Sequence, residues 1–227
     1  GTAARADFTA PDTTPVADAD VETLREMLGS PAAPTRRRAV LALAERRPGE
    51  EVHKDLRDRL REDPDAEVRQ FAVEALAMAG ADPAMIREGL DDEDPWVRAE
   101  AVVSLKKVAP ESAVDAFERL LSDPHPAVRR NALISLHHVQ GPAAVEALRK
   151  GLDDESERVR EWAVRLLASV DEPGVESTLA DHLESESSDV VRGAAGRALG
   201  GDVDVDISGG TETRQAGDHV LNRPPGR

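Results

Sequence analysis

One nine-residue segment sets the pattern for most of this chain: Val68-Arg69-Gln70-Phe71-Ala72-Val73-Glu74-Ala75-Leu76. The pattern returns at Val97-Arg98-Ala99-Glu100-Ala101-Val102-Val103-Ser104-Leu105 and at Val128-Arg129-Arg130-Asn131-Ala132-Leu133-Ile134-Ser135-Leu136. Two further copies begin at Val159-Arg160 and Val191-Arg192, and a degenerate first copy runs from Thr35-Arg36 to Leu43. Self-similarity at a regular period indicates a repeat architecture.

The repeated arginine measures the length of one unit. Successive copies lie 29 to 33 residues apart, at Arg36, Arg69, Arg98, Arg129, Arg160 and Arg192. A hairpin of two short helices needs about this length. A leucine eight or nine residues before each arginine ends a preceding helix whose apolar residues are three or four apart. Each unit therefore reads as helix A, a turn and helix B.

The turns carry residues that end helices. Asp63-Pro64, Asp94-Pro95 and Asp123-Pro124 each place a helix-capping acid beside a proline, which a helix accepts only in its first turn. Gly80, Pro110, Gly141-Pro142 and Pro173-Gly174 break the chain between units. Hairpins of this kind can bury their apolar faces only against neighbouring hairpins. The sequence therefore predicts an all-α superhelical solenoid of about six two-helix repeats over residues 21–200.

The two ends of the chain lack this pattern. Residues 1–20 are rich in Ala, Thr, Pro and Asp and are expected to form a flexible N-terminal arm. Residues 201–227 are expected to form a disordered acidic and Gly/Pro-rich tail. The alternation of Val203, Val205 and Ile207 leaves one short strand as an alternative within that tail.

The repeats resemble HEAT repeats, specifically the short variety of the phycobilisome-lyase-like HEAT family with its D-x-x-x-V-R-x-x-A-x-x-A-L signature. The resemblance covers roughly residues 20 to 200. It implies a right-handed α-solenoid in which the B helices line the concave surface. Since such arrays serve many tasks, the resemblance indicates the fold more strongly than the function.

Composition excludes several kinds of chemistry. The chain has no Cys, which rules out disulfides, thiolate metal sites, iron–sulfur clusters and cysteine nucleophiles. Hydrophobic residues make up 40% of the chain but aromatic residues only 2%, so the core must consist mainly of Ala, Leu and Val. No apolar run approaches the length of a transmembrane helix, and we expect no membrane insertion and a cytoplasmic location.

The charge is strongly acidic. Asp and Glu number 45 against 29 Lys and Arg, for a net charge of −16, and the only lysines are Lys54, Lys106, Lys107 and Lys150. An Asp- and Glu-rich, Lys-poor surface resembles cytosolic proteins of halophilic archaea, where salt screens like-charge repulsion. An ordinary acidic protein from a GC-rich genome has a similar composition.

A helical wheel of helix B gives a candidate partner-binding face. Counting the motif Val as zero, positions 2, 3, 6, 9 and 10 point away from the predicted core and would line the concave groove. The candidate binding residues are Arg37, Arg38, Phe71, Lys106, Lys107, Arg130, Ile134, His137, His138, Trp162 and Arg165. Basic and apolar side chains together are typical of protein-binding hot spots. The alternative is that Phe71 and Trp162 pack against an adjacent repeat.

The motif arginines have a different predicted role. Arg36, Arg69, Arg98, Arg129, Arg160 and Arg192 are expected to form structural ion pairs with acids of their own turn or of the next repeat. Such pairs contribute little individually when they are exposed to solvent.

No catalytic, metal or cofactor site is expected. None of the six histidines is followed by Glu, and neighbouring His137 and His138 diverge by about 100° on a helix, which is poor geometry for chelation. Phosphate-binding Gly-rich loops and serine-nucleophile motifs are missing. The sequence predicts a non-enzymatic scaffold that binds a protein, one with an acidic segment. Nucleic-acid binding, as in HEAT-like DNA glycosylases, and bilin-lyase-like activity remain alternatives, with Glu161, Trp162 and Arg165 the residues that would suit a glycosylase.

Overall fold

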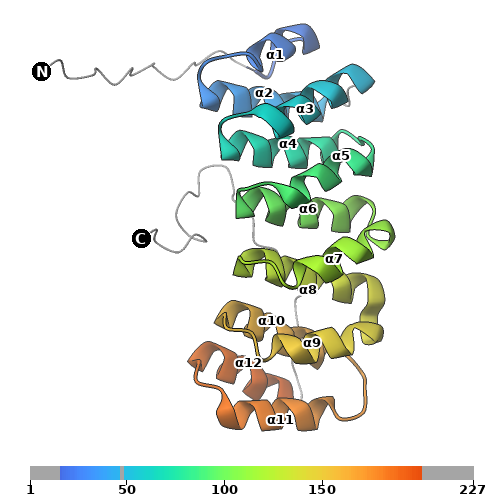
Figure 1. Cartoon of the computed structure of the whole chain (residues 1–227), viewed down its shortest axis with the longest axis vertical. Coiled ribbons are helices and arrows are strands. Elements are labelled where there is room, and N and C mark those ends of the chain that lie inside the picture. The colour runs from blue at the N-terminus through green and yellow to red at the C-terminus, as the bar shows by residue number, and fades with distance from the viewer. Residues whose placement is uncertain (1–15, 47–48, 201–227) are drawn as a thin grey trace, which may run out of the picture. The chain divides into compact units, whose positions relative to one another are not determined.

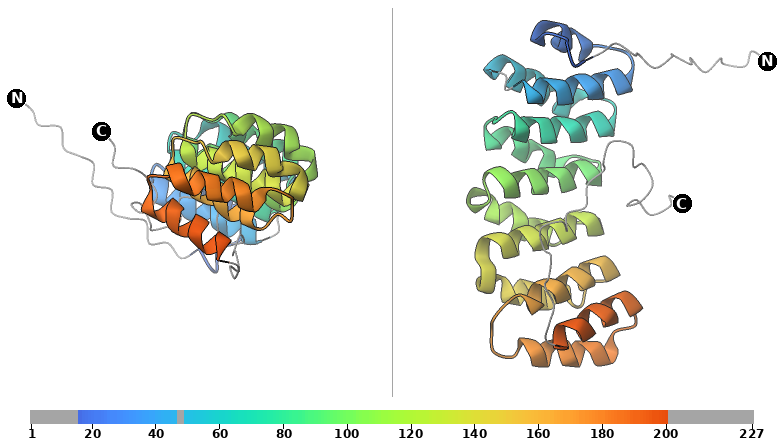
Figure 2. Two further views of the ribbon diagram at one scale, coloured as in Figure 1. Left: turned by 90° about the horizontal axis from the view of Figure 1, so that it is seen from below. Right: turned by 180° about the vertical axis from the view of Figure 1, so that it is seen from behind.

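The computed structural model describes residues 16–46 and 49–200 of this chain. All regular elements in these ranges are helices, which confirms the all-α prediction. The chain forms two compact units, residues 1–89 and residues 90–227. Within each unit, helical hairpins follow one another along the chain (Figure 1), and the views from below and behind show the same succession (Figure 2).

The N-terminal unit contains two complete hairpins and the start of a third. Its helices are α1 (Val21–Met27), α2 (Ala33–Glu45), α3 (Glu50–Glu62), α4 (Ala66–Met78) and α5 (Pro83–Arg87), followed by the 3-10 helix η1 (Glu88–Asp91) at the boundary. The A helices α1 and α3 pack on the B helices α2 and α4, which also pack on each other. Repeat boundaries therefore fall where the sequence period placed them.

The C-terminal unit continues the same plan. Its elements are α6 (Pro95–Val108), η2 (Glu111–Ala113), α7 (Val114–Leu120), α8 (Pro126–Gln140), η3 (Gly141–Ala144), α9 (Val145–Gly151), α10 (Glu157–Ala168), α11 (Val175–Ser185) and α12 (Asp189–Leu199). The B helices α6, α8, α10 and α12 form a row in which each contacts the next. The A helices α7, α9 and α11 each pack against the B helix of their own hairpin.

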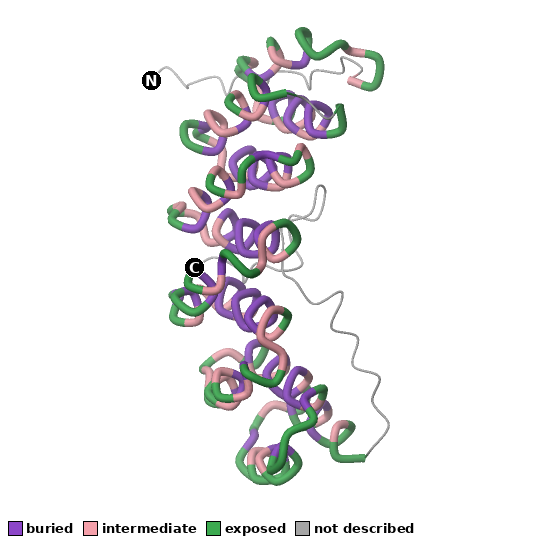
Figure 3. The backbone as a smooth tube through the Cα atoms, turned by 90° about the vertical axis from the view of Figure 1, so that its right-hand side faces the viewer, coloured by how far each residue is buried: buried purple, intermediate pink, exposed green. Residues whose placement is uncertain are grey.

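Burial follows this two-layer arrangement. In Figure 3 the buried backbone is concentrated in the B helices, whereas exposed residues gather in the turns and on the A helices. The core is built mainly of Ala, Val and Leu, as the composition predicted, with Trp96 and Phe117 among its largest fully buried side chains. A B helix with neighbouring repeats is thus covered both by its own A helix and by adjacent B helices.

The turn residues act partly as expected. Asp94 caps α6 by accepting a hydrogen bond from the amide of Trp96. The expectation that Asp63 and Asp123 are caps is wrong, because Asp65 and His125 cap α4 and α8 two residues later. Asp63 and Asp123 are freed from capping and bind an arginine instead, as described below.

The breaks between hairpins include residues with positive φ. Gly80, Gly141 and Gly174 have φ values of 71°, 54° and 86°. Residues with a Cβ rarely adopt this left-handed region, so glycine is the natural choice there. At the N-terminus, the carbonyls of Val16 and Ala17 accept hydrogen bonds from Arg46, so this part of the predicted arm is held at the carboxyl end of α2. Residues 1–15 and the predicted tail, with its alternative strand, lie outside the described residues.

Candidate functional site: the exposed face of the B helices

The motif arginines join one turn to the next. In the N-terminal unit, Arg36 donates from Nε and Nη2 to the two carboxylate oxygens of Asp63, at 2.8 and 2.9 Å. Its Nη1 donates to the carbonyl of Ser30 in its own turn, at 2.9 Å. A guanidinium fork matches a carboxylate in this paired geometry, which makes the contact specific as well as strong.

The same arrangement recurs in the C-terminal unit. Paired contacts join Arg98 to Asp123, Arg129 to Asp154 and Arg160 to Glu186, with N···O distances of 2.9 to 3.0 Å. Each of these acids also accepts a hydrogen bond from the backbone amide two residues later. We call this series of contacts the arginine ladder, comprising these three pairs and Arg36 with Asp63.

The ladder is more buried than the sequence suggested. Arg36 and Arg129 are 7 and 8% exposed, so the expectation of exposed pairs is wrong for these two ladder members. Nη1 of Arg69 donates to the carbonyl of Asp63, six residues before it, as Nη1 of Arg129 does to that of Asp123. In Arg36 and Arg129 the guanidinium lies between a carbonyl of its own turn and a carboxylate of the next repeat, and both exclude water from it. A helical wheel of one helix cannot predict this burial, because the carboxylate belongs to another repeat.

The apolar members of the predicted binding face are buried. Phe71, Ile134 and Trp162 are 4%, 3% and 5% exposed, so the expectation that they form exposed anchors is wrong. For Phe71 and Trp162, both at position 3, the cause is the row of B helices, because that position faces the preceding B helix. Asn131, at that position in α8, donates to the carbonyl of Ala99 in α6. The alternative considered for Phe71 and Trp162, burial between repeats, matches their surroundings.

Trp162 is nonetheless part of a basic cluster. The guanidinium carbons of Arg130 on α8 and Arg165 on α10 lie 5.4 and 5.1 Å from its ring centroid, within cation–π range. Arg165 also pairs with Glu161 at 2.7 Å, one turn earlier on the same helix. The indole thus holds two arginines close together at the surface while its own ring is covered.

A second group of basic side chains lies at the carboxyl ends of α6 and α8. It consists of Lys106, Lys107, His137 and His138. His137 Nε2 lies 3.2 Å from the hydroxyl of Ser169, which joins the carboxyl ends of α8 and α10, and α6 packs on the other side of α8. Within residues 16–46 and 49–200, neither lysine nor His138 has a hydrogen bond or ion pair.

Burial influences the protonation of this group. Burial, and then repulsion from Lys107, lowers the pKa of Lys106. Burial, and then His138, lowers the pKa of His137. In both cases burial disfavours the charged form and no carboxylate offsets this effect, so Lys106 carries a poorly compensated charge whereas His137 is held in its neutral form. A carboxylate brought to this surface would offset this effect for Lys106.

The corresponding positions of the N-terminal unit differ. Arg37 pairs with Glu67 at 2.5 Å, and both side chains are largely covered. Arg38, the other predicted binding residue there, is of intermediate exposure. The structure therefore places the predicted basic residues in separate environments rather than in one uniform stripe. We define the B-helix face as Lys106, Lys107, Arg130, His137, His138 and Arg165 of the C-terminal unit.

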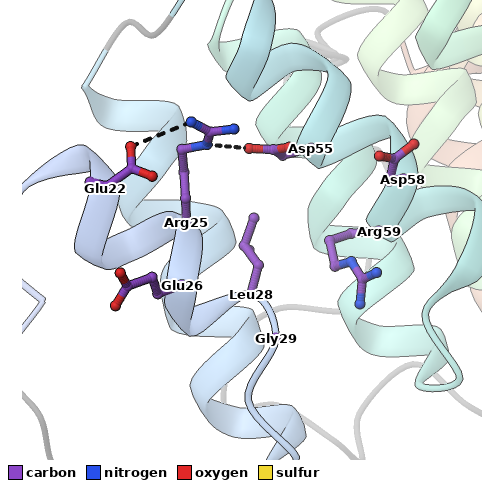
Figure 4. A pocket seen from close by; sticks show the side chains of 8 residues that line it. All are labelled: Glu22, Arg25, Glu26, Leu28, Gly29, Asp55, Asp58 and Arg59. Carbon is purple, nitrogen blue, oxygen red and sulfur yellow. Dashed lines mark hydrogen bonds and ion pairs between the residues drawn. The ribbon is translucent and has the colours of Figure 1, made fainter.

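Two clefts on the A-helix side were not anticipated. One, of about 350 Å³, lies between α1 and α3 in the N-terminal unit (Figure 4). Its wall carries Arg25, which pairs with Asp55 at 2.6 Å and also contacts Glu22. The other, of about 480 Å³, has Leu133 and Leu136 of α8 among its lining. The small residues Ala143, Ala147 and Gly151, spaced four apart in the sequence, also line this cleft and are the feature from which it could have been predicted.

Residues 16–46 and 49–200 contain neither a metal-binding cluster nor a membrane-spanning helix. No cluster of three or more His, Asp or Glu side chains in these ranges is placed to hold a metal ion. No helix there combines the length and apolarity needed to cross a bilayer.

The stacked hairpins and the ladder define an α-solenoid repeat protein. The family model for HEAT repeats matches residues 13–77, 54–123, 83–154 and 116–200. These matches together cover more than half of the sequence, so the chain belongs to the HEAT repeat family, as its motif predicted.

Three solved structures are similar to this chain. An engineered protein is 22% identical with a TM-score of 0.50, covering 80% of this chain and 98% of its own. The CpcE–CpcF complex of phycocyanin lyase from a Nostoc species is 17% identical with a TM-score of 0.41, covering 86% and 98%. An archaeal HEAT-like repeats protein from Thermococcus onnurineus is 16% identical with a TM-score of 0.47, covering 79% and 85%. No curated protein matches the sequence.

Proposed function

We propose that this chain is a non-enzymatic scaffold whose B-helix face binds an acidic segment of a protein partner. The proposal rests on Lys106 and Lys107, whose side chains have no counter-charge among the described residues of a chain with a net charge of −16. The described residues include many acids outside the ladder, yet none of them forms an ion pair with either lysine. The face is therefore complementary to a carboxylate-bearing ligand.

The helix dipole alone does not account for the lysines. A cation near a helix carboxyl end is favoured by about 0.3 to 1 kcal/mol, and Lys106 and Lys107 occupy the last turn of α6. A lysine gains this stabilisation from the helix dipole even when its side chain is fully solvated, so the dipole gives no reason for burial. Lys106 is instead partly buried, which costs hydration, and a partner carboxylate would restore the lost stabilisation.

The Trp162 cluster adds orientation to charge. Arg130 and Arg165 both rest against the indole ring, so less side-chain freedom is lost when they bind a ligand. Arginine forks suit the planar carboxylates of Asp and Glu side chains. The burial of Trp162, and the pairing of Glu161 with Arg165, weigh against the alternative of a DNA glycosylase that stacks this ring on a base.

The test measures binding of a fluorescent oligoglutamate peptide to the full chain by anisotropy. We expect Lys106→Glu with Lys107→Glu to weaken binding about tenfold or more, equivalent to about 1.4 kcal/mol. Arg119→Glu with Lys150→Glu is the matched control, because it makes the same charge change on A helices. It should alter the affinity less than about twofold.

Two outcomes would contradict the proposal. Equal weakening by both double variants would mean that only net charge matters, as expected for non-specific attraction. Tighter binding of a duplex DNA of equal charge, lost in the Lys106 and Lys107 variant, would instead favour nucleic acid as the ligand. Cytoplasmic location and adaptation to high salt remain predictions from composition.

A further inference from the structure

The cleft of about 480 Å³ on the A-helix side of the C-terminal unit takes no part in the proposed function. Residues of α7, α8 and α9 line it, and α7 and α9 both pack on α8 (Figure 1). Leu133 and Leu136 of α8 are 3% and 2% exposed and form its base, whereas Leu121 and Ala147 are partly exposed and form its sides. Its volume lies within the range of about 300 to 1,000 Å³ that is usual for ligand pockets.

The N-terminal unit shows how successive repeats are otherwise joined on the A-helix side. An arginine three residues before the leucine near the end of each A helix pairs with an acid of the next repeat. Arg25 pairs with Asp55 at 2.6 Å, and Nε of Arg57 donates to Glu88 at 2.8 Å. Each of these ion pairs connects one A helix to the repeat that follows it.

The same positions around the cleft carry exchanged charges. In α7, Glu118 takes the place of the arginine, three residues before Leu121, and in the next repeat Lys150 takes the position of Glu88. Glu118 and Lys150 are exposed and line the cleft, yet neither forms an ion pair within residues 16–46 and 49–200. The cleft therefore has one acidic and one basic side chain at its margins, and both are accessible to charges of a ligand.

Two further polar side chains of the cleft, Gln140 and Glu146, form no hydrogen bond or ion pair within the described part of the chain. Gln140 is partly buried at the end of α8, and its carboxamide offers both the donor and the acceptor that a peptide group requires. Glu146 lies four residues before Lys150 on α9, which corresponds to about 6 Å along the helix axis. The cleft thus combines an apolar base with separated acidic and basic groups.

We propose that this cleft binds an extended peptide segment of a partner protein in which an apolar residue lies between a basic and an acidic residue. The apolar side chain occupies the space above Leu133 and Leu136. The basic side chain pairs with Glu118 and Glu146, and the acidic one pairs with Lys150. This site is independent of the B-helix face and of the acidic segment that the face binds.

The spacing of the charges fits such a segment. An extended chain advances about 3.4 Å per residue, so the distance along α9 from Glu146 to Lys150 corresponds to roughly two residues. One apolar residue then separates the two charged ones, and its backbone is within the cleft that the Gln140 carboxamide lines. A nucleic acid or a fatty carboxylate fits less well, because its negative charge would meet Glu118 and Glu146.

Fluorescence anisotropy on the full chain tests the inference with a labelled heptapeptide, blocked at both ends, that carries a leucine between a lysine and a glutamate. Ala147→Met should weaken binding about fivefold or more, because the longer side chain fills the cleft. Methionine already stands at this position of α5, as Met85. Thr178→Met is the matched control at the same position of α11, outside the cleft, and should change the affinity less than about twofold.

Variants of the peptide test each contact without altering the fold. Replacing its leucine by glycine should weaken binding to the parent chain about fivefold or more, but should hardly affect binding to Ala147→Met. Lys150→Gln should weaken binding of the original peptide about threefold, as expected for an exposed ion pair, but not that of a peptide with glutamine in place of its glutamate. The variant with Lys106→Glu and Lys107→Glu should bind the peptide as the parent chain does.

Several results would overturn the inference. Unchanged binding to Ala147→Met would show that the peptide lies elsewhere, and equal weakening by Thr178→Met would show that any bulkier A-helix residue disturbs it. Equal affinities of the leucine and glycine peptides would show that the cleft accepts no apolar side chain. Weakening by the Lys106 and Lys107 variant would place the peptide on the B-helix face. If Ala147→Met lowers the melting temperature, the peptide series and Lys150→Gln decide instead, since they leave the packing around the cleft unchanged.

Discussion

Replacing Arg129 by Gln should test how strongly the ladder holds neighbouring repeats together. The Arg129 side chain is 9% exposed and that of Asp154 is 15% exposed, and their two N···O distances are both 2.9 Å. Glutamine cannot supply the charged fork, so Asp154 would stay largely covered without its counter-ion. Removing one partner of a buried pair costs about 3 to 5 kcal/mol.

Asp154 keeps one hydrogen bond in the variant, from the amide of Ser156 at 2.8 Å. We therefore expect a loss of about 2 to 4 kcal/mol in the free energy of unfolding. Arg119→Gln is the matched control, because Arg119 pairs with Asp91 at 3.0 Å but both side chains are more than half exposed. Exposed pairs contribute about 0 to 1 kcal/mol.

Urea denaturation followed by tryptophan fluorescence provides the measurement. The chain has two tryptophans, Trp96 and Trp162, and both belong to the C-terminal unit that contains Arg119 and Arg129. The midpoint should fall clearly for Arg129→Gln and hardly at all for Arg119→Gln. Equal shifts would refute the reasoning, because burial would then not determine the strength of the pair. A cycle with Asp154→Asn should show strong coupling to Arg129.

Two further predictions concern the buried ring of Trp162 and the buried carboxylate of Glu186. Trp162→Ala should lower the free energy of unfolding by about 3 to 5 kcal/mol, as expected for a buried aromatic side chain, and a stability equal to that of the parent would mean that the ring is exposed in solution. Burial opposes ionisation of Glu186, but hydrogen bonds from Arg160, the Ser188 amide and His182 outweigh it and lower its pKa to about 2. Because the folded pKa lies below the unfolded value of about 4.3, this stabilisation is present at neutral pH and is lost as the pH falls from about 4.5 towards 2. Thermal melting over that pH range should show a shallower dependence for Glu186→Gln, and an unchanged pH profile would contradict the assignment.

The order of the hairpins could be predicted from the sequence because its signals are local. The motif Val, Ala and Leu recur at helical spacing, and Gly or Pro marks the breaks, so repeat boundaries follow from neighbours along the chain. The ladder arginines were also recognisable, since one Arg stands at the same position in each copy. Their acids were harder to assign, because Asp63 and Asp123 resemble helix caps until the next repeat is in place.

Which positions of a B helix are exposed to solvent depends on the tertiary structure. A helical wheel assumes one covered side, whereas a B helix in the row has its own A helix and adjacent B helices around it. Position 3 therefore became interior, and Phe71 and Trp162 were covered, while Lys106 and Lys107 at the helix end stayed accessible in part. The sequence determined which residues repeat and where helices begin and end, because those properties depend on nearby residues. Which charges lack a counter-ion among the described residues depends on distant residues, as Lys106 shows.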